Sequence, residues 1–255
     1  MSRWTAFLLA GSRPKGDPLA QSMMLGHKAL IPVAGEPMVL RPLRALLASP
    51  EVGKVIVLTQ TPEDLRPVLP DDERVSIRKS GGTIAQTIAE QLAERGAEFP
   101  VLVVTADHAL LDPAMVAEFT RQAEGADLAI AVVESKPLLA RFPHTKRTWI
   151  GFKGGRYSGA NLFAFGSDKV LPAVGRWGQV EQDRKKGWRL LAALGPALLL
   201  GAVLKLRTIH ESATAIGRKL GIAIRIVEMS NPIAAIDVDK PLDHALVEDI
   251  IAGRA

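Results

Sequence analysis

The residues that could do chemistry begin with a glycine and two cations near the start of the chain. An apolar run, Trp4–Ala10, breaks off at Gly11, and Arg13 and Lys28 follow in a long polar stretch. Glycine lets backbone N–H groups approach phosphate oxygens closely, and two cationic side chains can neutralise the charge of a triphosphate. The pattern therefore predicts a triphosphate site. The alternative is a strand followed by an ordinary surface loop with two solvated cations.

Acidic residues after later apolar runs could hold a metal ion. Asp107 follows the run Val101–Val104, and the motif Asp237-Val238-Asp239 lies near the C-terminus. A Mg²⁺ ion bound beside phosphates needs only one or two carboxylates, because phosphate oxygens and water complete its coordination. Capping of the final helix by Asp239 or Asp243 is the competing interpretation.

Alternating apolar runs and helix-period segments predict the framework that positions these residues. Runs rich in Val, Ile and Leu on both faces are typical of a mostly parallel sheet with helices on both sides. In such sheets ligands bind at the carboxyl ends of the strands. We therefore expect Gly11, Thr59, residues 80–82 and Asp107 to meet at one edge. The expected strands are Val55–Leu58, Val75–Ile77, Val101–Val104 and Leu128–Val133, and the expected helices are Met38–Ala48, Thr83–Arg95 and one opened by Asp112-Pro113.

The second half of the chain differs in character. Thr148–Lys153 and Ala160–Phe165 predict two strands around a turn at Gly154-Gly155, and residues 170–220 have a largely helical pattern. A strand at Ile222–Val227 and a closing helix complete the chain. We expect a single α/β domain over residues 1–255: a three-layer, Rossmann-like sheet of the GT-A type with a helical insertion at about 167–220.

Composition narrows the class of protein. The net charge of +5 suits anionic partners. Only 5% of the residues are aromatic, which is too few for a surface on which nucleic-acid bases stack. We therefore expect no nucleic-acid partner. The absence of cysteine excludes disulfides, thiolate metal sites and a cysteine nucleophile. No secretory signal pattern opens the chain, and we expect a cytoplasmic protein.

The segment 184–204 is the most apolar part of the chain. It begins with three basic residues in succession and is interrupted by Gly195-Pro196, which makes it too short and broken for a membrane span. A buried helical hairpin is the default interpretation. The alternative is peripheral contact with a membrane surface, through the basic flank, a tryptophan and an apolar face.

The order of these features resembles the MobA-like nucleotidyltransferases. The resemblance depends on five parts of the sequence. They are Leu9-Ala10-Gly11-Ser12-Arg13, the segment Lys28–Met38 with its lysine well after the glycine loop, residues 80–83, Asp107 and the Asp237–Pro241 motif near the C-terminus. The resemblance covers most of residues 4–165 and 222–252 and leaves the helical insertion outside it.

The resemblance implies a role for each of these positions. Arg13 and Lys28 would bind and stabilise the triphosphate as the catalytic pair. Asp107 and Asp239 would hold Mg²⁺, with Asp237 as the rival of Asp239. The nucleotide-binding residues would be Leu9, Ala10, Gly11, Ser12, Gly81, Gly82 and Thr83, although Thr83 is also explained as a helix cap; the acceptor-binding residues would be Asn161, Arg147 and Lys153, with Arg156 beside them.

The function expected is transfer of an NMP from an NTP to a phosphorylated small-molecule acceptor, with release of pyrophosphate. Two alternatives stay open. A nucleotide-sugar glycosyltransferase would use the Asp237-Val238-Asp239 motif for its metal. A nucleotide-binding module without turnover would account for the glycine-poor first loop and the apolar segment. No metal-ligand spacing links His108, His144, His210 or His244 to other candidate ligands.

Overall fold

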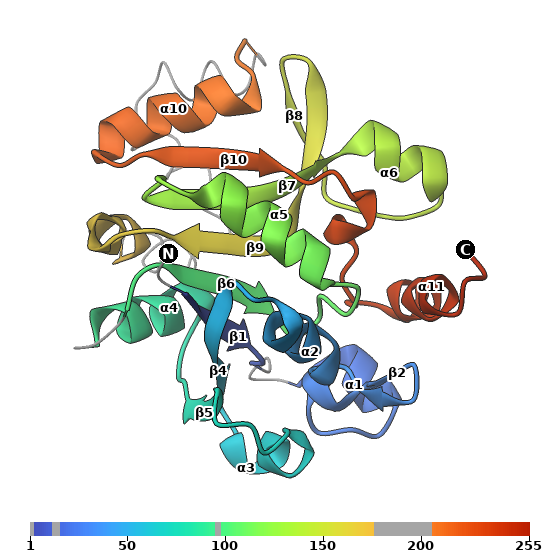
Figure 1. The fold of residues 1–255 in the computed structure, drawn as a ribbon. Coiled ribbons are helices and arrows are strands. Elements are labelled where there is room, and N and C mark those ends of the chain that lie inside the picture. The colour runs from blue at the N-terminus through green and yellow to red at the C-terminus, as the bar shows by residue number, and fades with distance from the viewer. Residues whose placement is uncertain (1–2, 12–15, 95–97, 176–205) are drawn as a thin grey trace.

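The computed structural model describes residues 3–11, 16–94, 98–175 and 206–255 (Figure 1). Its centre is an eight-stranded sheet in the order β10-β7-β9-β6-β1-β4-β5, with β8 paired to β9. Helices cover both faces, so the chain forms the three-layer α/β architecture that the sequence predicts.

Most neighbouring strands are parallel. β1 (Trp4–Leu9) lies between β4 (Val52–Thr59) and β6 (Val101–Thr105), and β5 (Val75–Lys79) extends the sheet beyond β4. β7 (Leu128–Glu134) and β10 (Ile224–Glu228) form a second parallel pair. β9 (Gly155–Phe165) joins the two groups as an antiparallel strand between β6 and β7, and β8 (Ile150–Phe152) pairs with it as a hairpin.

The strands are apolar on both faces because both faces are covered. In β1, the alternate residues Ala6 and Leu8 belong to one core, which includes Phe119 of α5 (Pro113–Ala123). Phe7, between them, points to the opposite core, which includes Ile88 of α4 (Ile84–Ala93). A two-residue period of side chains thus supplies both layers from a single strand.

The remaining elements surround this sheet. α2 (Leu40–Ala48) lies with α5 on one face, and a short hairpin of β2 (Pro32–Val33) and β3 (Glu36–Pro37) precedes it. The other helices that lie wholly within the described residues are α1 (Pro18–Ser22), α3 (Pro62–Leu65), α6 (Ser135–Arg141), α10 (Ile209–Leu220) and α11 (Pro241–Ile251). The 3₁₀ turns there are η1 (Lys28–Leu30), η2 (Arg66–Val68), η3 (Asp168–Val170) and η5 (Pro232–Ala235).

The predicted strands and helices of the described residues are present, with shifted ends and some additional short elements. The strand expected at Ala160–Phe165 begins five residues earlier, at Gly155, because the hairpin turns at Gly154, which has a φ of +93°. The short helices α1, α3 and α6 and the β2–β3 hairpin have no counterpart among the predicted elements, since such short segments show no clear helical or strand period. Of the expected insertion, residues 176–205, including the segment 184–204, lie outside the described residues.

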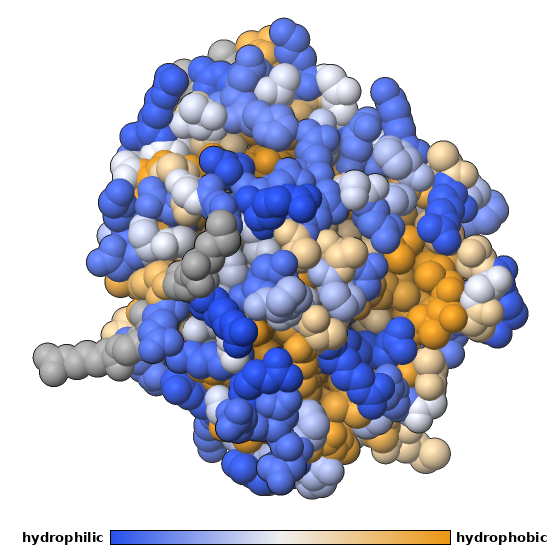
Figure 2. All heavy atoms as spheres, viewed as in Figure 1, coloured by the Kyte–Doolittle hydropathy of each residue, from blue (hydrophilic) through white to orange (hydrophobic). Residues whose placement is uncertain are grey.

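Figure 2 shows a largely polar face with an apolar area at its right, between α6 and α11. In the part of the chain that the structure describes, none of the helices combines the length and apolar character needed to cross a bilayer.

Candidate functional site

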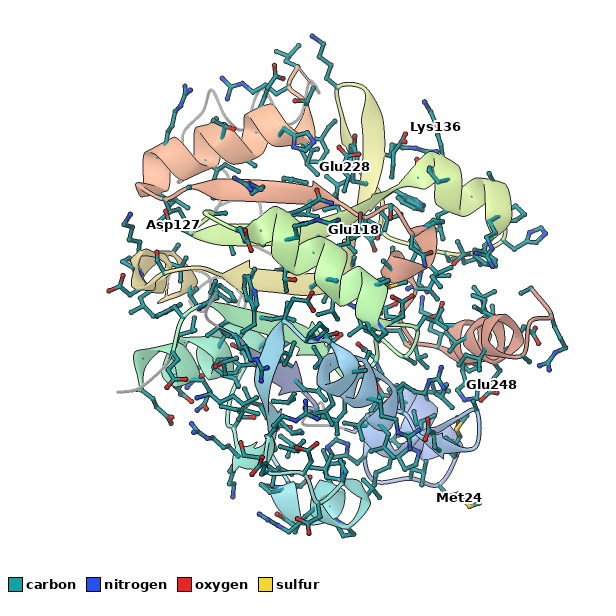
Figure 3. The ribbon with its side chains drawn as sticks, viewed as in Figure 1. Met24, Glu118, Asp127, Lys136, Glu228 and Glu248 are labelled. Carbon is teal, nitrogen blue, oxygen red and sulfur yellow. The ribbon has the colours of Figure 1, made fainter. Side chains whose placement is uncertain are left out.

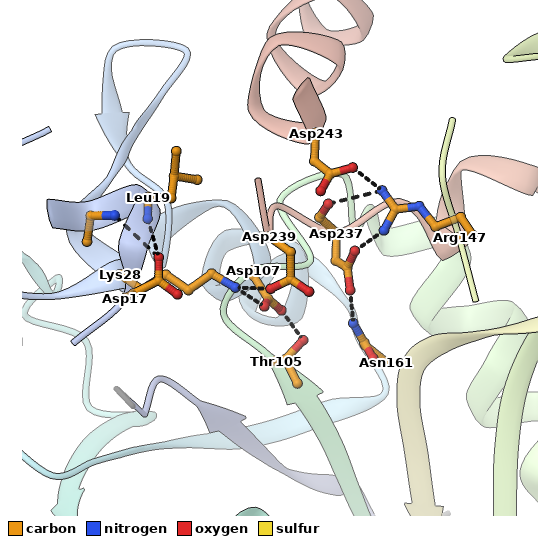
Figure 4. A network of polar contacts seen from close by, with 11 residues as sticks. Asp17, Leu19, Lys28, Thr105, Asp107, Arg147, Asn161, Asp237, Asp239 and Asp243 are labelled. Atoms are coloured by element: carbon orange, nitrogen blue, oxygen red, sulfur yellow. Dashed lines mark hydrogen bonds and ion pairs between the residues drawn. The ribbon is translucent and has the colours of Figure 1, made fainter. Parts of the chain in front are cut away.

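The carboxyl ends of β1, β4, β5 and β6 lie at one edge of the sheet, as the sequence predicts. The strand registers align Leu9 with both Leu58 and Thr105, and Thr59 with Lys79. The loops that follow these residues therefore emerge side by side, which brings the neighbourhoods of Gly11 and Asp107 together. Figure 4 shows the polar network that gathers at this edge.

Lys28 joins two aspartates that are far apart in the sequence. Its Nζ donates to Asp107 Oδ2 and to Asp239 Oδ1, each at 2.6 Å (Figure 4). The lysine side chain is 12% exposed, against 19% for Asp107 and 42% for Asp239. Two carboxylates and one ammonium thus converge at a place that solvent reaches through Asp239.

The charge of Lys28 is preserved by this arrangement. Burial acts to lower the pKa of the ammonium, but the carboxylates of Asp107 and Asp239 act against burial and raise that pKa overall. Lys28 is therefore a permanent cation at neutral pH.

His27 fixes the start of the turn that carries Lys28. Its Nδ1 accepts a hydrogen bond from the Ala29 N–H at 3.1 Å, so the neutral ring carries its proton on Nε2. That nitrogen lies 3.2 Å from Thr59 Oγ1, at the end of β4. Burial lowers the pKa of His27, which keeps the ring neutral.

The β2–β3 hairpin ties the same segment to the last helix. Ala34 and Gly35 form its turn with φ values of +52° and +80°, and the Ala34 N–H donates to Glu248 Oε1 of α11 at 2.7 Å. Glu248 is labelled on α11 in Figure 3. The chain after Lys28 and the helix after Asp239 are therefore held together.

Asp107 is oriented from two sides. The hydroxyl of Thr105, the last residue of β6, donates to Asp107 Oδ1 at 2.5 Å, which leaves Oδ2 for Lys28. The Val238 N–H donates to the Asp107 main-chain oxygen at 3.0 Å. This second bond joins the Asp107 loop directly to the segment that carries Asp239.

Asp237 binds different residues from those that bind Asp107 and Asp239. Arg147 forms an ion pair with Asp237 Oδ1, and Asn161 Nδ2 donates to Oδ2 at 2.9 Å. Arg147 also donates to Asp243 Oδ1 at 3.1 Å and is only 7% exposed. Both oxygens of Asp237 are thus engaged by the protein.

This geometry separates the two candidates for a second metal ligand. Burial raises the pKa of Asp237, and the nearby charges of Asp107 and Asp239 add to that rise, while Arg147 opposes it. Asp237 would have to give up Arg147 or Asn161 to bind a metal. Asp239, which shares a cation with Asp107, would be the better placed of the two to hold a metal ion together with Asp107.

The charges of the described network suit a divalent cation. The carboxylates of Asp107, Asp237, Asp239 and Asp243 exceed the cations Lys28 and Arg147 by two formal negative charges. Within the described ranges, no three His, Asp or Glu side chains converge as a complete metal cage. The donor set therefore fits Mg²⁺ completed by phosphate oxygens and water, for which one or two carboxylates suffice.

Part of the predicted nucleotide loop lies at the same edge. The Ala10 N–H donates to the Leu58 oxygen at 2.9 Å, and the Leu9 oxygen accepts from the Ala106 N–H at 2.9 Å. Gly11 follows as an exposed residue, and a Cβ there would lie 3.1 Å from the Gln60 side chain. Ser12 and Arg13 lie outside the described residues.

The glycine loop after β5 leads into α4. The φ of Gly82 is +83°, a conformation that favours glycine, whereas the space at Gly81 is open. Thr83 caps α4 by accepting from the Gln86 N–H at 3.3 Å. The cap accounts for the threonine, while the exposed Gly81 leaves room for a ligand to approach the backbone.

The predicted acceptor residues separate into two places. Arg147 and Asn161 lie in the aspartate network, with their side chains directed at Asp237. Lys153 lies at the tip of the β8–β9 hairpin, where its N–H donates to the Arg207 oxygen at 2.9 Å. The intervening length of strand spans on the order of 20 Å, so Lys153, and Arg156 near it, stand apart from the carboxylates.

Three residues contribute to the site although no motif in the sequence marks them as site residues. His27 and Thr105 show no motif of their own, although each lies within two residues of a predicted site residue. The sequence predicts for Asp243 only a cap of the final helix, whereas the N-cap of α11 is Lys240. Its bond to Arg147 depends on a long-range contact that no local pattern encodes. His108, by contrast, is completely buried and neutral, since burial lowers its pKa to about 4.

Several solved structures are similar to the chain over nearly its full length. A hypothetical transferase from Thermus thermophilus has a TM-score of 0.78 and 28% identity, over 95% of this chain and 100% of that chain. CMP:2-keto-3-deoxy-manno-octonic acid synthetase, solved with CTP, has a TM-score of 0.64 and 13% identity, over 100% of both chains. The 4-diphosphocytidyl-2C-methyl-D-erythritol synthase of Anaerococcus prevotii has a TM-score of 0.59 and 10% identity, over 98% and 99%.

No curated protein shows significant similarity to the chain. The family model described as the MobA-like NTP transferase domain matches residues 7–198, which include Lys28, Asp107, Arg147 and Asn161. Together with the three-layer fold and the polar edge of its sheet, this match shows that the chain belongs to the MobA-like NTP transferase family.

Proposed function

We propose that the protein transfers an NMP from an NTP to a phosphorylated small-molecule acceptor and releases pyrophosphate. The observation that carries the proposal is the convergence of Lys28, Asp107 and Asp239 at the carboxyl edge of the sheet. This edge is where a doubly covered parallel sheet binds ligands. Family membership and the CTP-bound structural neighbour support the same class of reaction.

The proposed reaction needs no strong general base. The acceptor phosphate is already ionised, and its oxygen attacks the α-phosphorus of the NTP while the bond to pyrophosphate breaks. Catalysis is then positioning and charge neutralisation. Lys28 would neutralise charge that develops on the phosphates. We propose the same role for Arg13, which lies outside the described residues.

Asp107 and Asp239 would hold Mg²⁺, and Thr105 would keep Asp107 oriented toward it. When bound, the ion would supply Lewis-acid polarisation of phosphate oxygens. The nucleotide is proposed to lie along the Leu9–Gly11 and Gly81–Thr83 loops, and the acceptor near Asn161.

The glycosyltransferase alternative loses support from the position of Asp237. A glycosyltransferase of this kind would use both aspartates of the Asp237-Val238-Asp239 motif to bind its metal ion. In the structure, the carboxylate of Asp237 is bound by Arg147 and Asn161 instead. A binding module without turnover is separated from the proposal by the experiment below.

Pyrophosphate release tests the proposal. The protein is incubated with Mg²⁺, each of the four NTPs and a panel of sugar phosphates and polyol phosphates. We expect release with one NTP and one class of acceptor, and its loss in Asp107→Ala and Lys28→Ala proteins that remain folded by circular dichroism. The exposed Lys146→Ala variant is the matched control. Release that survives both site changes would remove this site from the reaction, and NTP binding without release would favour the module.

A further inference from the structure

Lys28 occupies the position where two carboxylates would hold a metal ion. Oxygens of Asp107 and Asp239 each lie 2.6 Å from its Nζ, so both point at one cation-sized place. A Mg²⁺ ion bound to the same oxygens would lie about 2.1 Å from each of them. The ammonium and the metal ion would overlap there, and their like charges would repel.

We propose that Lys28 and a divalent cation compete for the carboxylates of Asp107 and Asp239, so that the lysine must leave them before the metal binds. The inference rests on the proposed function for the second partner of Lys28, the phosphates of an NTP. Without nucleotide, the ammonium bridges the two aspartates and offsets one of their two negative charges. With nucleotide, the ammonium moves to phosphate and the metal replaces it between the carboxylates.

The rest of the site is built to allow this exchange. Asp107 is also held by the hydroxyl of Thr105 and, at its main-chain oxygen, by the Val238 N–H, and neither of these bonds involves Lys28. Lys28 has a long side chain on a turn that His27 holds at the backbone. The lysine side chain can therefore change partner while the backbone on both sides stays in place.

The arrangement makes metal binding depend on nucleotide. Metal that arrives alone must displace an ammonium held by two charge-assisted hydrogen bonds. An NTP lowers this cost, because its phosphates offer Lys28 another set of anionic partners and add ligands for the metal. The consequence is weak metal affinity in the nucleotide-free protein.

Binding of Mn²⁺ to the nucleotide-free protein tests the proposal without any turnover. The free ion is measured by electron paramagnetic resonance for wild type, Lys28→Met and Lys240→Met. Lys240 is the matched control, because it is exposed and adjacent to Asp239 in the sequence. We expect the Lys28→Met protein to bind Mn²⁺ at least about tenfold more tightly than wild type, the effect of removing one charge-assisted competitor.

The control and a double variant locate the effect. Lys240→Met should change the affinity less than about twofold, and Lys28→Met combined with Asp107→Asn should lose the gain. Equal or weaker Mn²⁺ binding by folded Lys28→Met would overturn the proposal, even if the wild-type protein released pyrophosphate. Tighter Mn²⁺ binding by Lys28→Met would support the competition between Lys28 and the metal even if the protein turned over no NTP. That combination of results would contradict only the proposed function.

A second measurement uses the unaltered protein, in case Lys28→Met fails to fold. Acetylation of lysines by a limiting amount of acetic anhydride is followed by mass spectrometry, with Lys240 as the internal reference. Saturating Mg²⁺ should increase the acetylation of Lys28 relative to Lys240, because the metal releases the amine from its carboxylates. An unchanged or smaller ratio would contradict the proposal.

Discussion

Arg147 holds Asp237 at both its side chain and its main chain. The guanidinium forms an ion pair with the carboxylate and donates to the Asp237 main-chain oxygen at 3.2 Å. Asp239 follows two residues later, so this contact fixes the segment that presents Asp239 to Lys28. Arg147, which the sequence predicts to bind the acceptor, thus holds in place the segment that carries Asp239.

Loss of Arg147 should destabilise the protein. Arg147→Met leaves the largely buried carboxylates of Asp237 and Asp243 without their cation. We therefore expect the free energy of unfolding to fall by about 3 kcal/mol. Urea denaturation measures the change, with the exposed neighbour Lys146→Met as the control. Equal stability of the two variants would show that the ion pair contributes nothing. Adding Asp237→Asn should recover part of the loss.

Asp237 and Asp239 should differ in their effect on metal dependence. Asp239→Asn should raise the Mg²⁺ concentration for half-maximal pyrophosphate release by about tenfold or more, because a charged ligand becomes neutral. Asp237→Asn should leave this concentration nearly unchanged, since both its oxygens already serve Arg147 and Asn161. The reverse pattern would make Asp237 the ligand.

Thr105 should act as a positioning residue for Asp107. Thr105→Val keeps the shape of the side chain and removes the hydroxyl that bonds Asp107 Oδ1. We expect kcat for pyrophosphate release to fall by about tenfold, as one oriented hydrogen bond is lost, with a smaller change in KM for the NTP. Thr105→Ser should restore most of the rate. If Ser and Val variants behave alike, the hydroxyl has no such role.

Two neighbouring glycines should separate stability from nucleotide binding. Gly82→Ala forces a side chain into a φ of +83°, which should lower the free energy of unfolding by about 1 kcal/mol or more. At Gly81 a Cβ meets nothing within 4 Å, so Gly81→Ala should fold normally. It should nevertheless weaken thermal stabilisation by the NTP, if the loop approaches the nucleotide. Full stabilisation by the NTP in the Gly81→Ala protein would place the nucleotide elsewhere.

His27 should make stability sensitive to acid. The usual pKa of histidine is about 6.5, and burial lowers the pKa of His27 in the folded protein. As the pH falls below about 6.5, the unfolded chain therefore binds a proton at His27 before the folded protein does, and the free energy of unfolding decreases. Urea denaturation between about pH 7 and 5 should show a shallower decrease for His27→Asn than for wild type.

The variant His144→Asn removes one exposed imidazole and serves as the control for this comparison. If His27→Asn and wild type lost stability in parallel over the whole range, His27 would carry no part of the acid sensitivity. Asparagine keeps an acceptor close to the Ala29 N–H, so the local cap is least disturbed by this choice.

The sequence by itself determined the layers of the fold and the edge that carries the site. Apolar residues on both faces of β1 require cover on both sides, and the helices α4 and α5 begin at the capping residues Thr83 and Asp112. Once the strands are parallel, the residues after their carboxyl ends must meet at one edge. The convergence of Gly11, Thr59, residues 80–82 and Asp107 follows from that geometry alone.

Only the tertiary structure decided which side chains at this edge touch one another. Local pattern could not choose between Asp237 and Asp239, because residues two positions apart in an extended segment point to the same side and carry the same carboxylate. The difference between them was decided by Arg147 and Asn161, which bind Asp237 and are 90 and 76 residues away from it in the chain. The opening Gly11–Lys28 pattern predicted a cation for phosphates, but the bond from Lys28 to Asp239 spans 211 residues. Such contacts depend on strand order and packing, which no local spacing encodes.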